Sequence, residues 1–360
     1  MILDSNDTWI GLIVEEWLLF AAAAGFALTS IYAGRLPAFS LAELQVLFLL
    51  FVLFVVVKGL EHSGFISRLS RQLEQGRAIP LKLILITFFL SMVVTNDVAL
   101  TVIVPLTLML SIDRKDVLVI LEALAANAGS ALTPIGNPQN LFIYWFYDLG
   151  PGEFLASMAK FSLPYLALLV LAATALTTGR PEPALPPRKR IERSAYAYAG
   201  LLCLVILTVL RILPLAAAGL AVVYAVVFDR RSLRVDYALL LTFLCFFGLT
   251  DNIRALMGSR LVRAGDIFLV SAVSSQFISN VPATLLFAKF TTKWNALLWG
   301  ANVGGFGSLV GSLANLIAYK FFAARRSGKS QARFAAKFLL LGYIAFFIGI
   351  GLYFAMDKMP

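Results

Sequence analysis

The sequence has few of the residues on which most enzymes, metal sites and secreted domains depend. It contains only two cysteines, Cys203 and Cys245, both inside apolar runs, and a single histidine, His62. Two isolated cysteines exclude a disulfide framework, and with one histidine they form no metal-ligand cluster. Neither a P-loop nor an HExxH motif occurs, so the sequence predicts no direct use of ATP and no zinc-dependent hydrolysis.

Charged residues are also scarce, which indicates that most of the chain is surrounded by lipid. Only 14% of the 360 residues are charged and 60% are hydrophobic, whereas soluble domains are about a quarter charged. Apolar runs close to the roughly 20 residues that span a bilayer recur along the chain, and the alternating strands of an outer-membrane barrel do not. The sequence therefore predicts an all-α polytopic membrane protein in contact with the lipid bilayer. Its net charge of +10 lies in short loops, which membrane orientation explains without nucleic acid.

Nine apolar segments predict membrane spans: 12–33, 41–60, 117–147, 154–178, 195–213, 215–229, 237–253, 294–323 and 334–356. Two further segments, 81–111 and 266–290, carry polar residues at their centres, and we interpret them as re-entrant hairpins. Segments 117–147 and 294–323 carry Gly, Ser, Thr or Pro at their centres, which predicts broken helices. Because the opening segment is acidic and no small-residue cleavage site follows it, we expect a retained first helix.

The loops between these segments differ in charge. With returning hairpins, one set of loops holds 17 Lys and Arg and the other set, with the C-terminus, holds 6. The positive-inside rule then predicts an inner-membrane protein with a cytoplasmic N-terminus and an extracytoplasmic C-terminus. The Pro-rich charged stretch 179–193 becomes a cytoplasmic linker between two halves.

The two halves contain matching motifs in the same order. Segment 126–142 (ANAGSALTPIGNPQNLF) aligns without a gap with 301–317 (ANVGGFGSLVGSLANLI), and 91–99 (SMVVTNDVA) aligns with 275–283 (SQFISNVPA). We expect repeat 1 over 1–178 and a linking helix with repeat 2 over 194–360. The first helices of the repeats are five spans apart, and an odd separation inverts the second copy. Two inverted repeats are the architecture of alternating-access transporters, with a binding site near the midplane.

Each predicted hairpin tip carries a hydroxyl residue followed by an asparagine: Thr95 and Asn96 in the first, Ser279 and Asn280 in the second. An asparagine supplies donors and an acceptor without the cost of a buried charge, and the helix that restarts there points its positive end at the site. The alternative is that these asparagines satisfy only the backbone of the bend. Asp97 follows the first pair, where it would take up a proton, contact a sodium ion or pair with a donor. Its alternative role is to cap the restarting helix.

The breaks in the two spanning helices supply the remaining candidates. Their freed carbonyls are expected to coordinate sodium or substrate, although small-residue helix packing explains the glycines of the second copy as well. We expect a substrate site of Thr95, Asn96, Thr133, Asn137, Ser279, Asn280 and Ser312. We expect an ion-coupling site of Asp97, Asn96, Gly129, Gly136, Asn280, Gly304 and Gly311.

The blocks VTNDVAL, EALAANAGSALTPIGNPQN, SSQFISNVPAT and GANVGGFGSLVGSLANLIA resemble the signatures of the ion transporter superfamily. This superfamily includes arsenite permeases, metal–citrate transporters, sodium/proton antiporters and divalent anion/sodium symporters, and the resemblance is strongest to a short branch of anion permeases. In the symporters each hairpin carries a Ser-Asn-Thr triplet that touches substrate and sodium. The resemblance therefore implies such roles for the two tip pairs, and sodium-coordinating carbonyls near 129–136 and 304–311. Here Asp97 and Val281 replace the third residue of the triplets, which argues against a dicarboxylate and is more similar to the arsenite and citrate branches.

The expected function is secondary active transport of a small carboxylate or inorganic oxyanion, coupled to sodium or protons. The alternatives are arsenite efflux or sodium/proton antiport, and then a channel. An intramembrane enzyme would need paired aspartates or a Ser–His arrangement at depth, and the sequence offers neither. No cofactor is expected apart from sodium as a coupling ion, and the sequence leaves a homodimer open.

Overall fold

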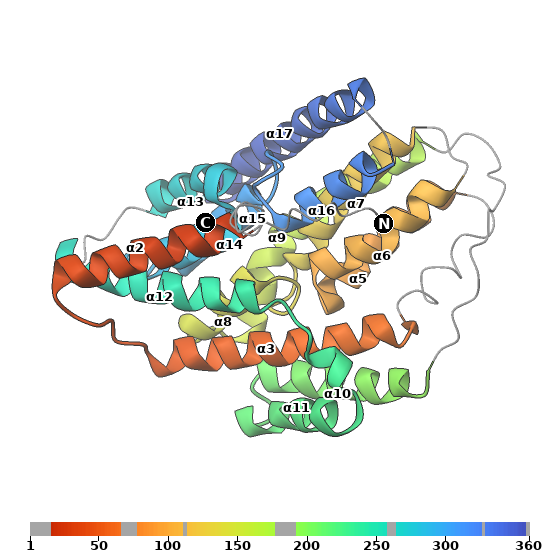
Figure 1. Ribbon diagram of the computed structural model, residues 1–360. Coiled ribbons are helices and arrows are strands. Elements are labelled where there is room, and N and C mark those ends of the chain that lie inside the picture. Colours follow the sequence, from red (N-terminus) through yellow and green to blue (C-terminus); the bar gives the residue numbers. More distant parts are fainter. Residues whose placement is uncertain are drawn as a thin grey trace.

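The computed structural model describes residues 16–65, 78–110, 114–176, 192–257, 264–325 and 328–357, and over these ranges its regular structure is entirely helical (Figure 1). The elements of the first half are α2 (Trp17–Ala33), α3 (Leu41–His62), α5 (Ile79–Val94), α6 (Asn96–Met109), α7 (Lys115–Ser130), α8 (Pro138–Phe146) and α9 (Pro151–Thr174). Those of the second half are α10 (Ser194–Val209), α11 (Leu215–Phe228), η1 (Arg230–Leu233), α12 (Tyr237–Met257), α13 (Ala264–Ile278), α14 (Asn280–Ala288), α15 (Trp294–Gly304), α16 (Leu313–Ala323) and α17 (Lys329–Asp357).

The structure supports the prediction of a multi-pass membrane protein. Four of the described helices are long and apolar enough to cross a membrane: Leu41–His62, Pro151–Leu176, Arg230–Leu256 and Lys329–Met356. Large apolar side chains such as Leu171, Phe277 and Phe347 are more than half exposed, as expected of a surface that faces lipid. Residues 12–15 of the first predicted span and 179–191 of the predicted linker lie outside the described residues, and the division into repeats stays a prediction.

Both segments interpreted as hairpins are helix pairs with a one-residue bend. Thr95 separates α5 from α6 with φ 84° and ψ 150°, and Ser279 separates α13 from α14 with φ 72° and ψ 157°. This backbone region is almost restricted to glycine and costs on the order of 1–3 kcal/mol for other residues. The same strained conformation therefore occurs at the matching position of both pairs.

Both predicted broken helices are broken. Helix α7 ends at Ser130 and α8 starts at Pro138, where the ring is tolerated in the first turn. Asn137 caps α8 because its Oδ1 accepts a hydrogen bond of 3.0 Å from the backbone N–H of Asn140. Helix α15 ends at Gly304 and α16 starts at Leu313, so the second break forms without proline.

The two helix pairs open toward opposite ends of the α7–α8 segment. Next to the start of α7, Lys115 Nζ donates to the carbonyl of Leu108 near the end of α6 at 3.3 Å. Next to the end of α8, the hydroxyl of Tyr147 donates to the carbonyl of Ala288 at the end of α14 at 2.7 Å. Figure 1 accordingly shows α5 and α6 at the right and α13 and α14 at the left. The orientation of the α7–α8 segment relative to the membrane stays a prediction, and so does the inversion of the two whole repeats.

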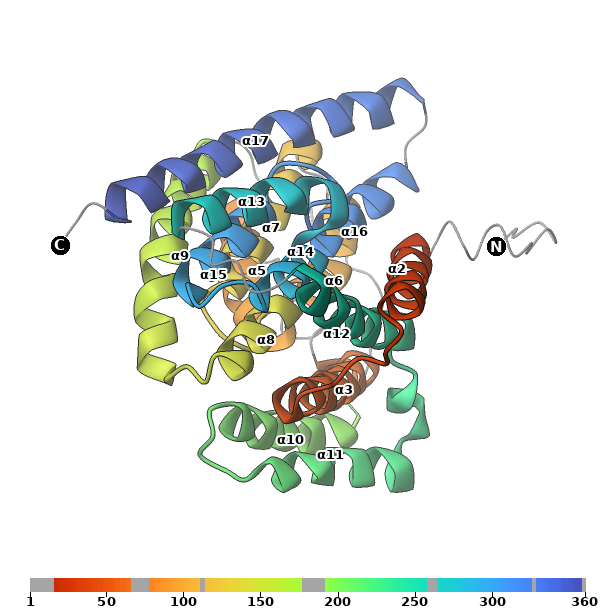
Figure 2. The same cartoon turned by 90° about the vertical axis from the view of Figure 1, so that its left-hand side faces the viewer.

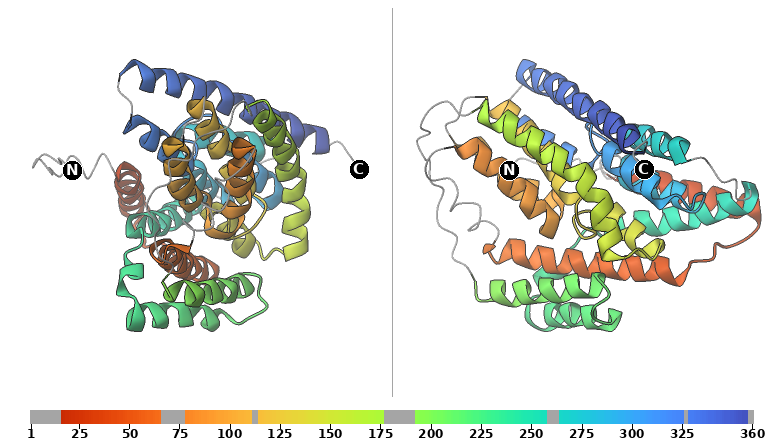
Figure 3. Two further views of the ribbon diagram at one scale, coloured as in Figure 1. Left: turned by 90° about the vertical axis from the view of Figure 1, so that its right-hand side faces the viewer. Right: turned by 180° about the vertical axis from the view of Figure 1, so that it is seen from behind.

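The remaining helices surround these central elements. Helices α10 and α11 pack on α3 at one side, α12 packs along α2, and α17 covers the side opposite α10 and α11 (Figures 2 and 3). The broken helices lie in the middle, where every residue of α7 from Leu118 to Ser130 is buried. The bends and breaks thus meet inside protein, which is where irregular backbone is tolerated at membrane depth.

Candidate functional site

Four buried asparagines join the two broken helices. Asn127 of α7 donates from Nδ2 to Oδ1 of Asn315 of α16 at 2.7 Å, and Asn302 of α15 donates to Oδ1 of Asn140 of α8 at 2.8 Å. In the sequence alignment Asn127 matches Asn302 and Asn140 matches Asn315. The two amide pairs are therefore equivalent contacts, and each joins the first half of the chain to the second.

The hairpin tips are bonded to the unwound segments in the same way in both halves. The backbone N–H of Asn96 donates to the carbonyl of Gly136 at 3.1 Å, and that of Asn280 donates to the carbonyl of Gly311 at 3.0 Å. These bonds satisfy the first amide of α6 and of α14, which has no partner inside its own helix. They also hold each tip beside the break in its own half of the chain.

Four helices begin around one cavity between these elements. Asn96, Pro138, Asn280 and Leu313 are the first residues of α6, α8, α14 and α16, and all four line the cavity. A helix N-terminus carries roughly half a positive charge from the aligned peptide dipoles. Four converging N-termini therefore make the cavity favourable for negative charge.

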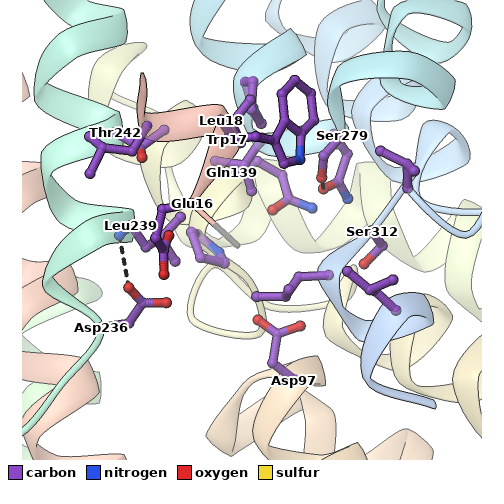
Figure 4. A pocket seen from close by; sticks show the side chains of 18 of the residues that line it. Glu16, Trp17, Leu18, Asp97, Gln139, Asp236, Leu239, Thr242, Ser279 and Ser312 are labelled. Atoms are coloured by element: carbon purple, nitrogen blue, oxygen red, sulfur yellow. Dashed lines mark hydrogen bonds between the residues drawn. The ribbon is translucent and has the colours of Figure 1, made fainter. Parts of the chain in front are cut away.

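The cavity has a volume of about 200 Å³ (Figure 4). It is lined by Glu16, Trp17, Leu18, Leu19, Asn96, Asp97, Pro138, Gln139, Asp236, Leu239, Thr242, Ser279, Asn280, Val281, Pro282, Leu309, Val310, Ser312, Leu313 and Leu316. The lining therefore combines polar groups at the helix starts with an apolar wall.

The two tip asparagines differ in what they bond. Asn96 donates from Nδ2 to Oδ1 of Asn127 at 3.1 Å and to Oγ of Ser312 at 3.4 Å. Asn280 is equally buried, with 3% of its surface exposed, yet its Oδ1 receives only a 3.5 Å contact from Ser279 Oγ. Its amide nitrogen donates to no side chain or carbonyl in the described part of the chain. Asn280 is thus the tip asparagine with a donor available to a bound molecule.

Asp97 points its carboxylate into the cavity, and Asp236 lies across from it at the start of α12 (Figure 4). One Asp97 oxygen, Oδ1, is buried and accepts no hydrogen bond from the residues that the structure describes. Asp236 Oδ1 accepts a hydrogen bond of 2.8 Å from the backbone N–H of Leu239. No Lys, Arg or His is among the described residues that line the cavity, so the carboxylates have no basic side chain beside them there.

The other predicted site residues lie behind the cavity wall. Thr133 donates to the carbonyl of Met92 at 2.5 Å, and Asn137 donates to Oγ of Ser130 at 3.1 Å. Thr95 forms the strained bend but does not line the cavity. The structure therefore brings Asn96, Asp97, Ser279, Asn280 and Ser312 to the cavity and gives Thr95, Thr133 and Asn137 supporting positions.

The four predicted glycines also lie outside the lining. The carbonyls of Gly136 and Gly311 accept the tip amides, and the carbonyl of Gly304 accepts a hydrogen bond of 2.9 Å from Gln276 Nε2. Gly129 lies against the backbone of Phe88. Each of these carbonyls already has one donor, so a sodium ion would have to use the second lone pair.

The model of the citrate transporter family matches residues 9–299 of this sequence. The chain belongs to the citrate transporter family. Over 95% of its length it is 31% identical to an uncharacterized transporter of Methanocaldococcus jannaschii, of which it covers 97%. It is 38% identical to the inner membrane protein YbiR of Escherichia coli over 76% of this chain and 78% of that protein. A silicon efflux transporter of Oryza sativa subsp. japonica is 37% identical over a shorter stretch, 29% of this chain and 23% of that protein.

Membership of the citrate transporter family confirms the resemblance seen in the motif blocks. Sequence reasoning nevertheless missed four polar residues of the cavity, Glu16, Gln139, Asp236 and Thr242. Gln139 stands inside the motif of the first break, so its place there was a usable signal. Asp236 and Thr242 carried no such signal in the sequence, because they lie outside the motifs, at the start of a predicted span that packs beside the site.

Proposed function

We propose that this member of the citrate transporter family is a secondary active transporter of a small anion, a carboxylate or an inorganic oxyanion, that works by alternating access. The observation that carries the proposal is the convergence of four helix N-termini on one cavity that also holds a carboxylate with an unbonded oxygen. The N-termini favour the anion. The carboxylate supplies the place for a coupling cation.

The anion is held at the start of α14 and α16. The hydroxyl of Ser312 already donates to Oδ1 of Asn127 at 3.0 Å. Asn280 offers its amide donor, and the hydroxyl of Ser279 lies beside it. These groups donate hydrogen bonds without carrying charge, so they add specificity to the attraction of the helix ends. Asn96 also lines the cavity, and its amide donates to Oγ of Ser312.

Coupling follows from the charges in the cavity. Ionised Asp97 and Asp236 oppose entry of a bare anion, because like charges repel strongly at low dielectric. A proton or a sodium ion on Asp97 removes that repulsion, so cation and anion bind better together than alone. Mutual stabilisation of this kind links the gradient of the cation to movement of the anion.

A second candidate is cation-coupled efflux of an uncharged hydroxylated solute, or sodium/proton antiport. The carboxylate-lined cavity without a lining basic side chain favours it, and one relative is named a silicon efflux transporter. In this scheme Asp97 carries the exchanged cation.

We further propose an inner-membrane location with the N-terminus in the cytoplasm, as the 17-to-6 distribution of basic residues indicates.

Uptake into proteoliposomes of the full chain tests these schemes. The probes are labelled citrate, phosphate, sulfate, arsenite and silicic acid, each under a sodium gradient, a proton gradient and no gradient. We expect one or more of the anions to accumulate only with a cation gradient, and Asn280→Ala to abolish that uptake. Asn295→Ala is the matched control, because Asn295 contacts Ser157 away from the cavity.

Sodium or proton exchange without movement of any anion would support the antiport alternative and reject the proposed anion transport. Gradient-independent flux through the native protein at channel rates would reject both.

A further inference from the structure

Four charged residues meet where α2 leads into α3. Lys289 Nζ lies 2.7 Å from Glu43 Oε1 and 3.8 Å from Asp251 Oδ1, and Arg35 forms an ion pair with the other oxygen of Asp251. The backbone N–H of Ala38 donates to that same oxygen at 3.0 Å. The cluster therefore joins the α2–α3 connection, α3, α12 and the residue after α14.

The pair at the centre of the cluster is buried. The side chain of Glu43 is 0% exposed and that of Lys289 is 7% exposed. Such a pair is stable only when its remaining groups are also bonded. Glu43 Oε2 accepts hydrogen bonds from the backbone N–H and the hydroxyl of Ser40, at 2.7 and 2.9 Å, and Lys289 donates to the carbonyl of Phe247 at 3.4 Å.

Helix α14 links this cluster to the cavity. It has nine residues; its first, Asn280, lines the cavity, and Lys289 follows its last. The cavity and the charged cluster are also separated along α12. Asp236 at the start of this helix lines the cavity, and Asp251 of the cluster lies roughly four turns further on. A movement of α14 away from α3 and α12 would open the cavity toward the cluster and would separate Lys289 from Glu43.

We propose that Lys289 and Glu43, with Asp251 as the neighbouring carboxylate, form a gate that closes the cavity at the α2–α3 end and opens once in each transport cycle. This inference rests on the proposed alternating access. The gate is closed in the present structure, and the cavity lies at the other ends of α2 and α12. In the predicted topology the gate is extracytoplasmic.

Labelling of one cysteine in the cavity tests the gate without knowledge of the substrate. The reporter is Leu309→Cys in a full chain that carries Cys203→Ala and Cys245→Ala, reconstituted in proteoliposomes. A membrane-impermeant maleimide is applied from each side in turn. K289M and E43Q should each raise the labelling rate from the α2–α3 side by at least about tenfold, the shift expected when a two-state bias is removed.

Combined variants and a control show whether the two single changes act through the same interaction. K289M combined with E43Q should act like either change alone, because both remove one interaction. The exchange E43K/K289E should return the rate toward that of the native chain. K337M is the matched control. It breaks the 2.5 Å ion pair of Lys337 with Asp116, which is more exposed than the Lys289–Glu43 pair and lies on other helices. This change should leave labelling from the α2–α3 side unchanged.

Three results would overturn the gate. Folded K289M and E43Q proteins with native labelling rates would make the pair a static contact. Loss of folding in K289M that the exchange variant restores would make it a structural contact needed for assembly. A reporter that reacts from only one side in every variant would overturn the gate and alternating access together, which separates failure of the gate from failure of the proposed function.

Discussion

Replacement of Gly129 by alanine tests the packing that positions the first hairpin tip. A Cβ at Gly129 would lie 2.1 Å from the carbonyl oxygen of Phe88 and 2.6 Å from Oγ of Ser91, both on α5. Relief of that overlap moves α5 by about 1 Å, and overpacking of this kind costs about 1–3 kcal/mol. Because α5 ends one residue before Thr95, its displacement also moves the tip and should lower transport.

The equivalent glycine of the second half gives a sharper form of this test. A Cβ at Gly304 would lie 2.4 Å from Oγ and 2.5 Å from Cβ of Ser275, and its next neighbour is 3.2 Å away. Ser275→Gly should therefore rescue Gly304→Ala, with a coupling energy of about 1 kcal/mol or more. Ser91→Gly should rescue Gly129→Ala much less, because the Phe88 carbonyl stays in place.

Unfolding of the purified protein by SDS titration in mixed micelles, followed by tryptophan fluorescence, measures these differences. Gly152→Ala is the control, because nothing lies within 4 Å of its added Cβ and alanine has a higher helix propensity than glycine. A Gly129→Ala protein as stable as Gly152→Ala would refute the close approach of α5 and α7.

Three further predictions concern the tip, the carboxylate and the topology. Thr95→Gly should raise the melting temperature in detergent by relieving backbone strain of about 1–3 kcal/mol, whereas Thr95→Ala keeps the strain; equal effects of the two changes would argue against a strained bend. Asp97→Asn should preserve exchange of bound anion across the membrane but lower gradient-driven accumulation at least about tenfold, equivalent to about 1.4 kcal/mol; unchanged accumulation at several pH values would leave Asp97 as a helix cap. Maleimide should label Gly152→Cys from outside intact cells and Ser330→Cys only after lysis, and labelling of both from one side would contradict the predicted topology.

Much of the helical architecture follows from local features of the sequence. The bend at Thr95 and the break before Pro138 are marked by a polar residue in an apolar run and by proline, which lacks an N–H donor. The alignment of the two halves also located the second bend at Ser279, whose own neighbourhood is less distinctive. These features can be predicted because each depends on a few adjacent residues and on the scarcity of charge that indicates lipid.

The candidate site could be predicted only in part. The asparagine and aspartate of the first tip and the Ser-Asn pair of the second line the cavity as expected. Thr133 and Asn137 instead bond within the wall, because a polar residue near a break can satisfy the unwound backbone as well as a ligand. Sequence spacing does not distinguish these two uses.

The sequence by itself indicated an all-α membrane protein that resembles the ion transporter superfamily, and it located where the helices bend and break. Only the tertiary structure decided which residues meet: Asn127 with Asn315, 188 positions away, Asp97 across from Asp236, and Lys289 with Glu43. Bends and breaks depend on neighbouring residues along the chain, whereas a hydrogen-bond or charge partner depends on which distant helices pack together. That packing is chosen by the whole apolar core, in which every buried polar group must find a partner, and no single motif encodes it.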